Sequence, residues 1–166
     1  RMGEFQITHT FGVRPLQQYL IPFDKGKYQC LPIAWDTNKK RWFDMAGMVY
    51  QPEDLKPESW FYWTNQSQNW NGMCAECHST NLQKNYNLEN DSFNTTWSDI
   101  DVNCEACHGP GSEHLDWAKL PDGARDYDDD MGLVLKTSGT TSKQFIESCA
   151  PCLSRRTSFG PNYHAE

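Results

Sequence analysis

The sequence lacks the long apolar segments that a membrane protein or a large aliphatic core would need. Hydrophobic residues make up only 37% of the 166 residues, whereas Trp, Tyr and Phe together account for 13%. The longest apolar runs, at 45–50 and 131–135, fall well short of the roughly 18 residues that a membrane-spanning helix requires. We therefore expect no membrane insertion, and a core in which flat aromatic rings supply much of the buried surface.

Positive charge is also scarce. The chain has 15 Lys and Arg residues against 22 Asp and Glu residues, which gives a formal net charge of −7. A surface of this sign repels phosphate backbones and anionic lipids, so we expect no nucleic-acid partner. The same charge favours a partner protein of basic character.

Residues 1–63 have the pattern of short strands separated by turns. β-Branched and aromatic residues are mixed in 5–11 and 27–35, and turn-forming residues occupy 24–26 and 36–38. Several prolines limit the length of any strand in this part of the chain. We predict a small antiparallel β-meander here.

Residues 64–166 are less regular. Asn, Ser and Gln are frequent in the first half of this segment and hydrophobic periodicity is weak, so it needs a ligand or crosslinks to hold a fixed shape. Two short helices are predicted, at 111–120 with Ser112 as N-cap and at 141–153 with Ser142 as N-cap. The expected fold class is therefore mixed, with little regular secondary structure.

Cysteine provides the strongest signal. Six of the seven cysteines form three CxxC pairs, and two of these pairs are followed directly by histidine, in CAECH at 74–78 and CEACH at 104–108. A shuffled sequence of this composition would contain roughly 0.01 CxxCH strings. Two such strings in one chain therefore indicate a function.

The CxxCH spacing is that of covalent haem attachment. Two thiols three positions apart on one turn can each add to a vinyl group of a haem, and the His that follows then lies beneath the porphyrin as the proximal iron ligand. The predicted cofactor-binding residues are Cys74, Cys77 and His78 at one site, and Cys104, Cys107 and His108 at the other. We expect two c-type haems, with the short helices and loops of 64–166 wrapped around them.

Other uses of the cysteines remain open. The four thiols of the two motifs can bind one zinc ion as in a zinc ribbon, although a His after both pairs has no role there, or the pairs can form disulfides. The third pair, Cys149 and Cys152, is followed by Leu153, which cannot bind iron, so a third haem is not expected. Cys30 is left over as a half-buried small hydrophobic residue.

The remaining histidines, His9, His114 and His164, are the candidates for sixth ligands to iron. His114 is favoured because it follows His108 closely, after a Gly-Pro-Gly turn that can redirect the chain. Methionine thioethers can also bind iron, but core packing is the better expectation for each Met.

The stretches NWNGMCAECHSTNLQKNYN and TTWSDIDVNCEACHGPGSEHLDWA also carry a family resemblance. They are similar to multihaem c-type cytochromes related to the tetrahaem electron acceptor of hydroxylamine oxidoreductase, and more closely to a branch whose longer members often continue into tetratricopeptide repeats. FGVRPLQQYL, LPIAWD, RWF and CAPCLSRRTSFGPNYH extend the resemblance over nearly the whole chain. The resemblance implies haem at both CxxCH motifs and a distal-ligand role for His114.

The chain departs from this family in three ways. Leu153 stands where the family usually has a third CxxCH histidine, and Tyr62 begins a Tyr-Trp-Thr where the family usually has His-Trp-Thr. Family members also tend to run on with further CxxCH motifs, whereas this sequence ends at Glu166. We therefore expect a fragment or a truncated relative, and the absence of a signal peptide fits either a fragment or a cleaved leader.

These features together predict electron transfer. Covalent haem and the lack of lysine-rich character point to an exported respiratory protein, periplasmic or extracellular as the resemblance implies, with a redox partner protein and further haem domains or subunits. The alternatives are a haem enzyme with a five-coordinate iron acting on a small nitrogen or sulfur compound, and a haem-bearing module of a larger redox complex.

Overall fold

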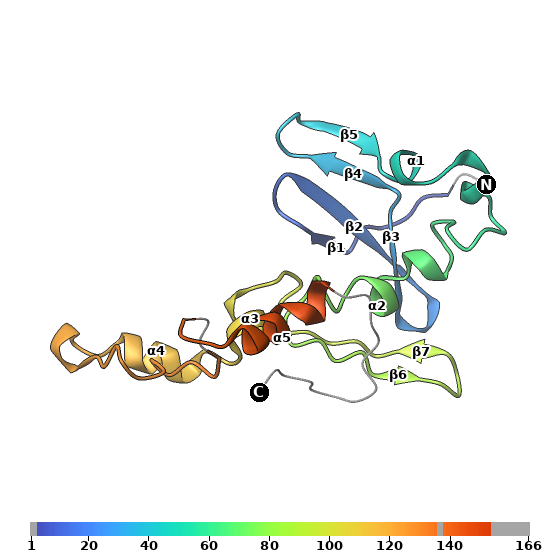
Figure 1. Ribbon diagram of the computed structural model, residues 1–166. Helices are drawn as coiled ribbons and strands as arrows, with labels where there is room; N and C mark the ends of the chain where they lie inside the picture. The colour runs from blue at the N-terminus through green and yellow to red at the C-terminus, as the bar shows by residue number, and fades with distance from the viewer. Residues whose placement is uncertain (1–2, 136–137, 154–166) are drawn as a thin grey trace.

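The computed structural model describes residues 3–135 and 138–153, which form a mixed fold of antiparallel strands and short helices (Figure 1). The strands are β1 (His9–Phe11), β2 (Leu16–Phe23), β3 (Lys27–Cys30), β4 (Ile33–Asp36), β5 (Arg41–Asp44), β6 (Tyr86–Asn87) and β7 (Ser92–Phe93). The α-helices are α1 (Ala46–Val49), α2 (Trp70–Met73), α3 (Cys104–His108), α4 (Ser112–Ala118) and α5 (Ser142–Leu153). Short 3₁₀ turns are η1 (Asp24–Gly26), η2 (Pro52–Leu55), η3 (Gln66–Gln68) and η4 (Asp122–Ala124).

β2 is the central strand of the antiparallel sheet. β1 pairs with one edge of β2, where His9 lies opposite Leu20. On the other edge, the second half of β2 pairs with β3, where Leu20 lies opposite Cys30, and its first half pairs with β4, where Leu16 lies opposite Asp36. A proline-containing break separates β3 from β4, since proline has no N–H to donate to the ladder. β5 then completes the sheet beside β4.

The hydrophobic core joins this sheet to the first CxxCH motif. Leu20 and Cys30 from the sheet pack with Trp70 and Ala75, and all four are buried. The Trp70 ring meets Trp97 edge-on, with 5.2 Å between the ring centroids. As the composition predicts, aromatic rings supply much of this core, and segments on both sides of position 63 contribute to it.

A buried amide ties three segments together beside this core. The backbone N–H of Tyr28 donates to Asn71 Oδ1 at 2.7 Å, and Asn71 Nδ2 donates to the Gly26 carbonyl at 3.2 Å and to Thr95 Oγ1 at 2.9 Å. One side chain thereby fixes α2 to the β2–β3 turn and to the segment after β7, and satisfies backbone groups that would otherwise be buried without partners.

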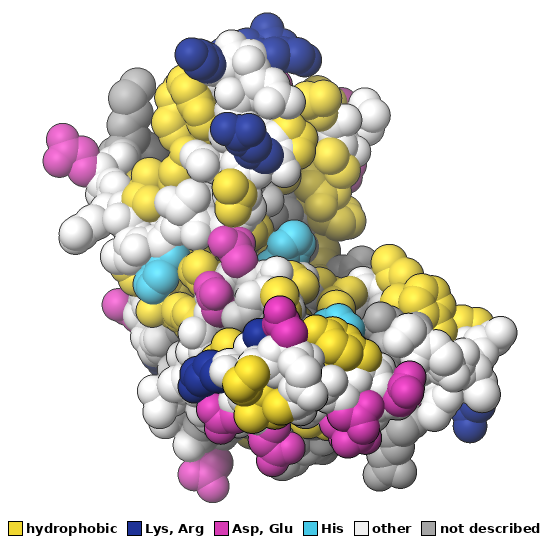
Figure 2. Space-filling view, turned by 90° about the vertical axis from the view of Figure 1, so that its left-hand side faces the viewer, with side chains coloured by type: hydrophobic (Ala, Val, Ile, Leu, Met, Phe, Trp, Pro, Cys, Tyr) yellow, Lys and Arg dark blue, Asp and Glu magenta, His cyan; other side chains and the backbone are white. Residues whose placement is uncertain are grey.

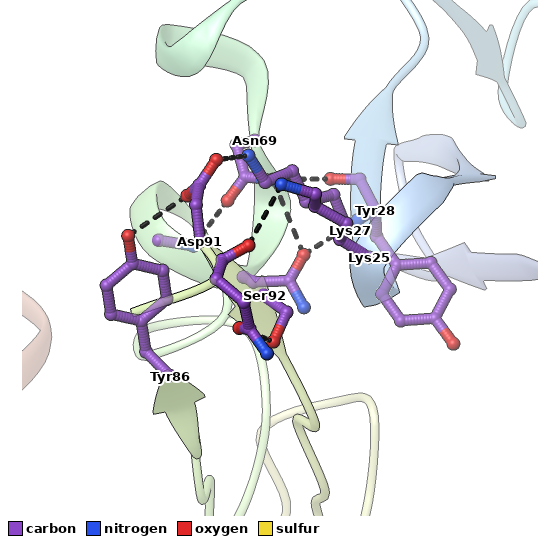
Figure 3. Close-up of polar contacts among 10 residues, drawn as sticks. Lys25, Lys27, Tyr28, Asn69, Tyr86, Asp91 and Ser92 are labelled. Carbon is purple, nitrogen blue, oxygen red and sulfur yellow. Dashed lines mark hydrogen bonds and ion pairs between the residues drawn. The ribbon is translucent and has the colours of Figure 1, made fainter. Parts of the chain in front are cut away.

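The β6–β7 hairpin is held against the β2–β3 turn by polar contacts (Figure 3). Lys27 forms an ion pair with Asp91, and Lys25 Nζ donates to the Asn90 carbonyl at 2.9 Å. The Tyr86 hydroxyl donates to Asp91 Oδ1 at 3.0 Å. The sequence did not predict this hairpin, because its two-residue strands are too short to show periodicity.

The two predicted helices are present as α4 and α5, but the predicted N-caps are wrong. Ser112 is already the first helical residue of α4, and Gly111 is the cap. Before α5, Thr141 takes the capping role: its Oγ1 accepts from the Gln144 N–H at 3.3 Å, while Gln144 Oε1 accepts from the Thr141 N–H at 3.0 Å. This reciprocal pair places Ser142 inside the helix.

The predicted fold class is confirmed: a small antiparallel sheet is followed by short helices and loops. The sheet is more than a meander, because β2 has two partners along one edge. Across residues 3–135 and 138–153, no helix combines the length and the apolar character needed to cross a membrane.

Candidate haem sites

The first CxxCH motif begins at the residue that ends α2, Cys74. Asn69 Oδ1 accepts from the Gly72 N–H at 3.0 Å and so caps the start of α2. The chain then continues through a turn in which the His78 N–H donates to the Cys74 carbonyl at 3.1 Å. This turn carries Cys74, Cys77 and His78 together, as haem attachment requires.

The inner side of this motif faces the core. Ala75 is fully buried, and the Cys74 Sγ lies 3.9 Å from the Cys30 Sγ. The hydrogen bond with Cys74, together with burial, raises the pKa of the Cys30 thiol far above its usual value. The His78 ring packs edge-on against Phe11, with 5.5 Å between the centroids. The core therefore fixes the motif on one side, and the His78 side chain touches Phe11 of this core while remaining exposed to solvent.

The third cysteine pair lies beside the first motif. The Cys77 thiol donates to the Cys152 carbonyl in α5 at 3.5 Å. Cys149 is half-buried on the same helix, and the Leu153 side chain is exposed. The pair thus borders a predicted haem site, although Leu153 offers no iron ligand.

The second motif forms a helix of its own, α3. Asn103 Oδ1 accepts from the Glu105 N–H at 2.9 Å and caps the helix, and Gly109 ends it with a φ of 74°. Cys104 and Cys107 are both exposed on this single helical segment. The two motifs therefore differ locally: the first lies in a turn after the Asn-capped helix α2, whereas the second is itself the Asn-capped helix α3, with His108 as its last residue.

The glutamate inside each motif ties the turn to the segment that follows. Glu76 forms an ion pair with Lys84 at 2.7 Å, and both side chains are half-buried. Glu105 Oε1 accepts from the Gly111 N–H at 2.8 Å. These contacts support the shape of both turns without using a predicted attachment residue.

A backbone carbonyl group orients the ring of each of His108 and His114. His108 Nδ1 lies 2.7 Å from the Leu135 carbonyl oxygen, and His114 Nδ1 lies 2.8 Å from the Met131 carbonyl oxygen. A carbonyl oxygen only accepts, so each Nδ1 donates and each neutral ring keeps its lone pair on Nε2. The remaining nitrogen is the one available to iron. No sequence pattern marks the two carbonyl groups, because every residue carries one.

The other two candidate ligands are placed differently. The His9 ring packs edge-on against Tyr28 and Trp97, and its Nδ1 lies 2.9 Å from Thr8 Oγ1. This aromatic cluster accounts for the position of His9 by packing. His164 lies outside the described residues.

The donor set fits haem better than zinc. Within the described part of the chain, no group of three or more His, Cys, Asp or Glu side chains is arranged to hold a metal ion. The two CxxC pairs therefore do not converge as the four thiolates of a zinc ribbon would. Each motif instead presents two thiols and one imidazole from one local turn.

Exposed apolar side chains surround the second motif. Val102 precedes it, Leu115 follows it in α4, and Val134 contacts Gly109 at its C-terminal end. Val134 is 71% exposed. A flat apolar ligand attached at Cys104 and Cys107 would cover such side chains.

Residues 37–109 match the protein family described as cytochrome c554 and c-prime. This match includes both CxxCH motifs and extends over less than half of the chain. It supports the interpretation of the chain as a multihaem c-type cytochrome.

Two solved structures are similar to this chain. The outer cell wall cytochrome OcwA is 22% identical, with a TM-score of 0.40 over 74% of this chain and 21% of that one. The undecahaem cytochrome from the S-layer of Carboxydothermus ferrireducens is 20% identical, with a TM-score of 0.43 over 88% of this chain and 18% of that one. The chain thus spans about a fifth of the length of each structure. A search of curated protein sequences finds no match.

Proposed function

We propose that this chain is an electron-transfer segment of a multihaem c-type cytochrome, with two covalently attached haems. The observation that carries the proposal is the pair of CxxCH motifs, each folded on one helical turn with its cysteines and histidine together. The family match over residues 37–109 supports it as well, because it includes both motifs together with the sequence around them.

Each site would hold its haem through the residues of one turn. Cys74 and Cys77 would form the thioethers of the first site and His78 would bind its iron, while Cys104, Cys107 and His108 would do the same at the second site. Bound haem supplies one-electron cycling between Fe(III) and Fe(II). The chain supplies the tethers, the orientation of the imidazoles and the packing that keeps the first site in place.

We further propose that the protein is exported and belongs to a larger respiratory assembly. Covalent haem attachment supports export, and further haem domains or subunits are part of the same proposal. The relation to the electron acceptor of hydroxylamine oxidoreductase and to the branch with tetratricopeptide repeats is part of this proposal, as is a basic redox partner protein.

Mass spectrometry of the intact chain, made in a host that matures c-type cytochromes, tests the proposal. We expect two added haem masses. The double variant Cys104→Ser/Cys107→Ser should carry one haem, because the thiols that form the second tether are gone. The matched control Cys149→Ser/Cys152→Ser should still carry two, because Leu153 provides no proximal ligand at the third pair.

Other results would contradict the proposal. A colourless protein, or pigment that acid acetone extracts, would show that no haem is covalently attached. Bound zinc without haem would favour the ribbon, and three haem masses would show that Leu153 does not prevent attachment. Carbon monoxide binding by the reduced protein would indicate an open iron position and favour the enzyme alternative.

A further inference from the structure

Residues 131–135, which we call the strap, lie along α3 and the start of α4. The Leu135 N–H donates to the His108 carbonyl at 3.2 Å, and the His108 Nδ1 donates back to the Leu135 carbonyl at 2.7 Å. At the other end of the strap, the Met131 carbonyl accepts from His114 Nδ1 at 2.8 Å. The two ends of one short segment therefore hold two different imidazoles.

The strap approaches these helices closely at two glycines, where a larger residue would collide. A Cβ at Gly132, where φ is +70°, would lie 2.6 Å from the carbonyl carbon and oxygen of Glu113. A Cβ at Gly109, where φ is +74°, would lie 2.9 Å from the Cβ of Val134. Because real Cβ atoms do not approach backbone atoms this closely, any side chain at Gly132 would push the strap away from α4.

This arrangement matters for a metal-binding imidazole. An Nδ1–H that donates to a fixed carbonyl sets the tautomer and the ring orientation, and it makes Nε2 a stronger electron donor. A stronger donor stabilises Fe(III) relative to Fe(II) and lowers the reduction potential. The side chains of the residues that provide the carbonyls do not affect this hydrogen bond directly, because the backbone supplies the acceptor.

We propose that the strap is a positioning element, which orients the iron-binding nitrogens of both His108 and His114 and lowers the reduction potential of the iron that each of them binds. The inference rests on the proposed function. It adds that a segment outside both CxxCH motifs influences the reduction potential of the iron. It also adds that the same five residues orient both the proximal ligand of the second site and the candidate sixth ligand.

The substitution Gly132→Ala tests the strap in the haem-loaded protein. We expect the variant to keep two haem masses, and one haem to shift its ferric-to-ferrous equilibrium about tenfold toward Fe(II), a rise of about 59 mV for a one-electron couple. Potentiometric titration followed by absorbance measures this shift, and electron paramagnetic resonance of the oxidised protein reports the accompanying change in ligand geometry.

Gly139→Ala is the matched control. Gly139 also has a positive φ, +76°, but nothing lies within 4 Å of the Cβ that Ala would add. This control shares the backbone strain and lacks the collision, so its potentials should equal those of the unchanged protein. Equal shifts in both variants, or no shift in either, would overturn the inference about the strap. If both variants still carried two haem masses, the proposed function would be unaffected by that result. Absence of haem from the unchanged protein would overturn both.

A measurement on the unchanged holoprotein decides the matter if Gly132→Ala does not accumulate. In the reduced protein with ¹⁵N-labelled histidine, the Nδ1–H protons of His108 and His114 should exchange slowly with solvent, because each is hydrogen-bonded to a backbone carbonyl. Exchange of both protons at the rate of free histidine would show that the strap does not hold the rings.

Discussion

Asn71 shows how one side chain outside the CxxCH residues can stabilise a haem-binding segment. Its amide is fully buried and bonds to Tyr28, Gly26 and Thr95. Asn71→Leu would place a larger apolar side chain of similar branching in this buried site and remove the partner of the Tyr28 N–H and of the Gly26 carbonyl. Since each such loss costs about 1–3 kcal/mol, we expect the free energy of unfolding to fall by about 2 kcal/mol or more. Chemical denaturation of the haem-loaded protein measures it.

The exposed Asn38 provides the control for this substitution. Asn38 lies in the turn between β4 and β5 with its side chain in solvent, so Asn38→Leu should change the unfolding free energy by no more than about 0.5 kcal/mol. Equal stability of the two variants would mean that the hydrogen bonds of Asn71 add nothing beyond those that water provides in the unfolded chain.

At this scale the sequence predicts side chains whose role follows from local spacing. In both motifs the two cysteines and the histidine lie together on one local turn. The spacing predicts this, because the residues that would attach the haem and the residues that form the turn are the same five consecutive residues. Their assignment to haem stays a prediction, as do the ligand roles of His9, His114 and His164. The Met131 and Leu135 carbonyls could not be predicted, since they meet the histidines only through a return of the chain.

At the scale of elements, Asp91 links the β6–β7 hairpin to the sheet. Hydrogen bonds from Lys27 and Tyr86 hold the pKa of the Asp91 carboxyl below its ordinary value. A lowered pKa in the folded state means that the contribution of Asp91 is complete above about pH 4 and is lost as the pH falls through the lowered value. At neutral pH, Asp91→Asn should speed hydrogen exchange at the β6–β7 amides and leave exchange in β2 unchanged, as measured by nuclear magnetic resonance.

Asp128→Asn is the corresponding control, because Asp128 lies exposed in the acidic loop before the strap. It should leave the hairpin amides unaffected. If Asp91→Asn also leaves them unaffected, the hairpin is held by packing such as the contact between the Tyr86 and Phe93 rings, and its ion pair contributes nothing measurable.

The elements themselves were predictable to different degrees. The sheet and the helices α4 and α5 follow from runs of residues with a clear period or a nearby cap, and the structure contains them. The long central strand β2 was missed, because Pro22 and two glutamines hide its alternation. The cap of α5 lies one residue earlier than predicted because Thr141 and Gln144 form a reciprocal pair of hydrogen bonds. The cap of α4 is Gly111, which makes no side-chain cap bond.

At the scale of the whole molecule, charge is unevenly distributed. On the face that Figure 2 shows, Lys and Arg side chains lie at the end formed by the sheet and at the margins of the part formed by the helices, whereas Asp and Glu side chains gather mainly on the part formed by the helices. The helical part contains α3 and the acidic loop at 126–130. The proposed basic redox partner would therefore be attracted toward the end of the molecule that carries the second candidate haem site.

This attraction predicts how electron transfer responds to salt. Raising the ionic strength from about 0.01 M to about 1 M shortens the screening length from about 30 Å to about 3 Å. The second-order rate of reduction by a small basic redox protein, followed by stopped-flow absorbance, should fall at least about tenfold over this range, because steering by opposite charges is lost. An acidic redox protein used as the second probe should react faster as salt rises, since screening weakens the repulsion between the two negative surfaces. A rate with the basic probe that is independent of salt would mean that the protein meets its partner through uncharged surface, and that its net charge of −7 serves solubility alone.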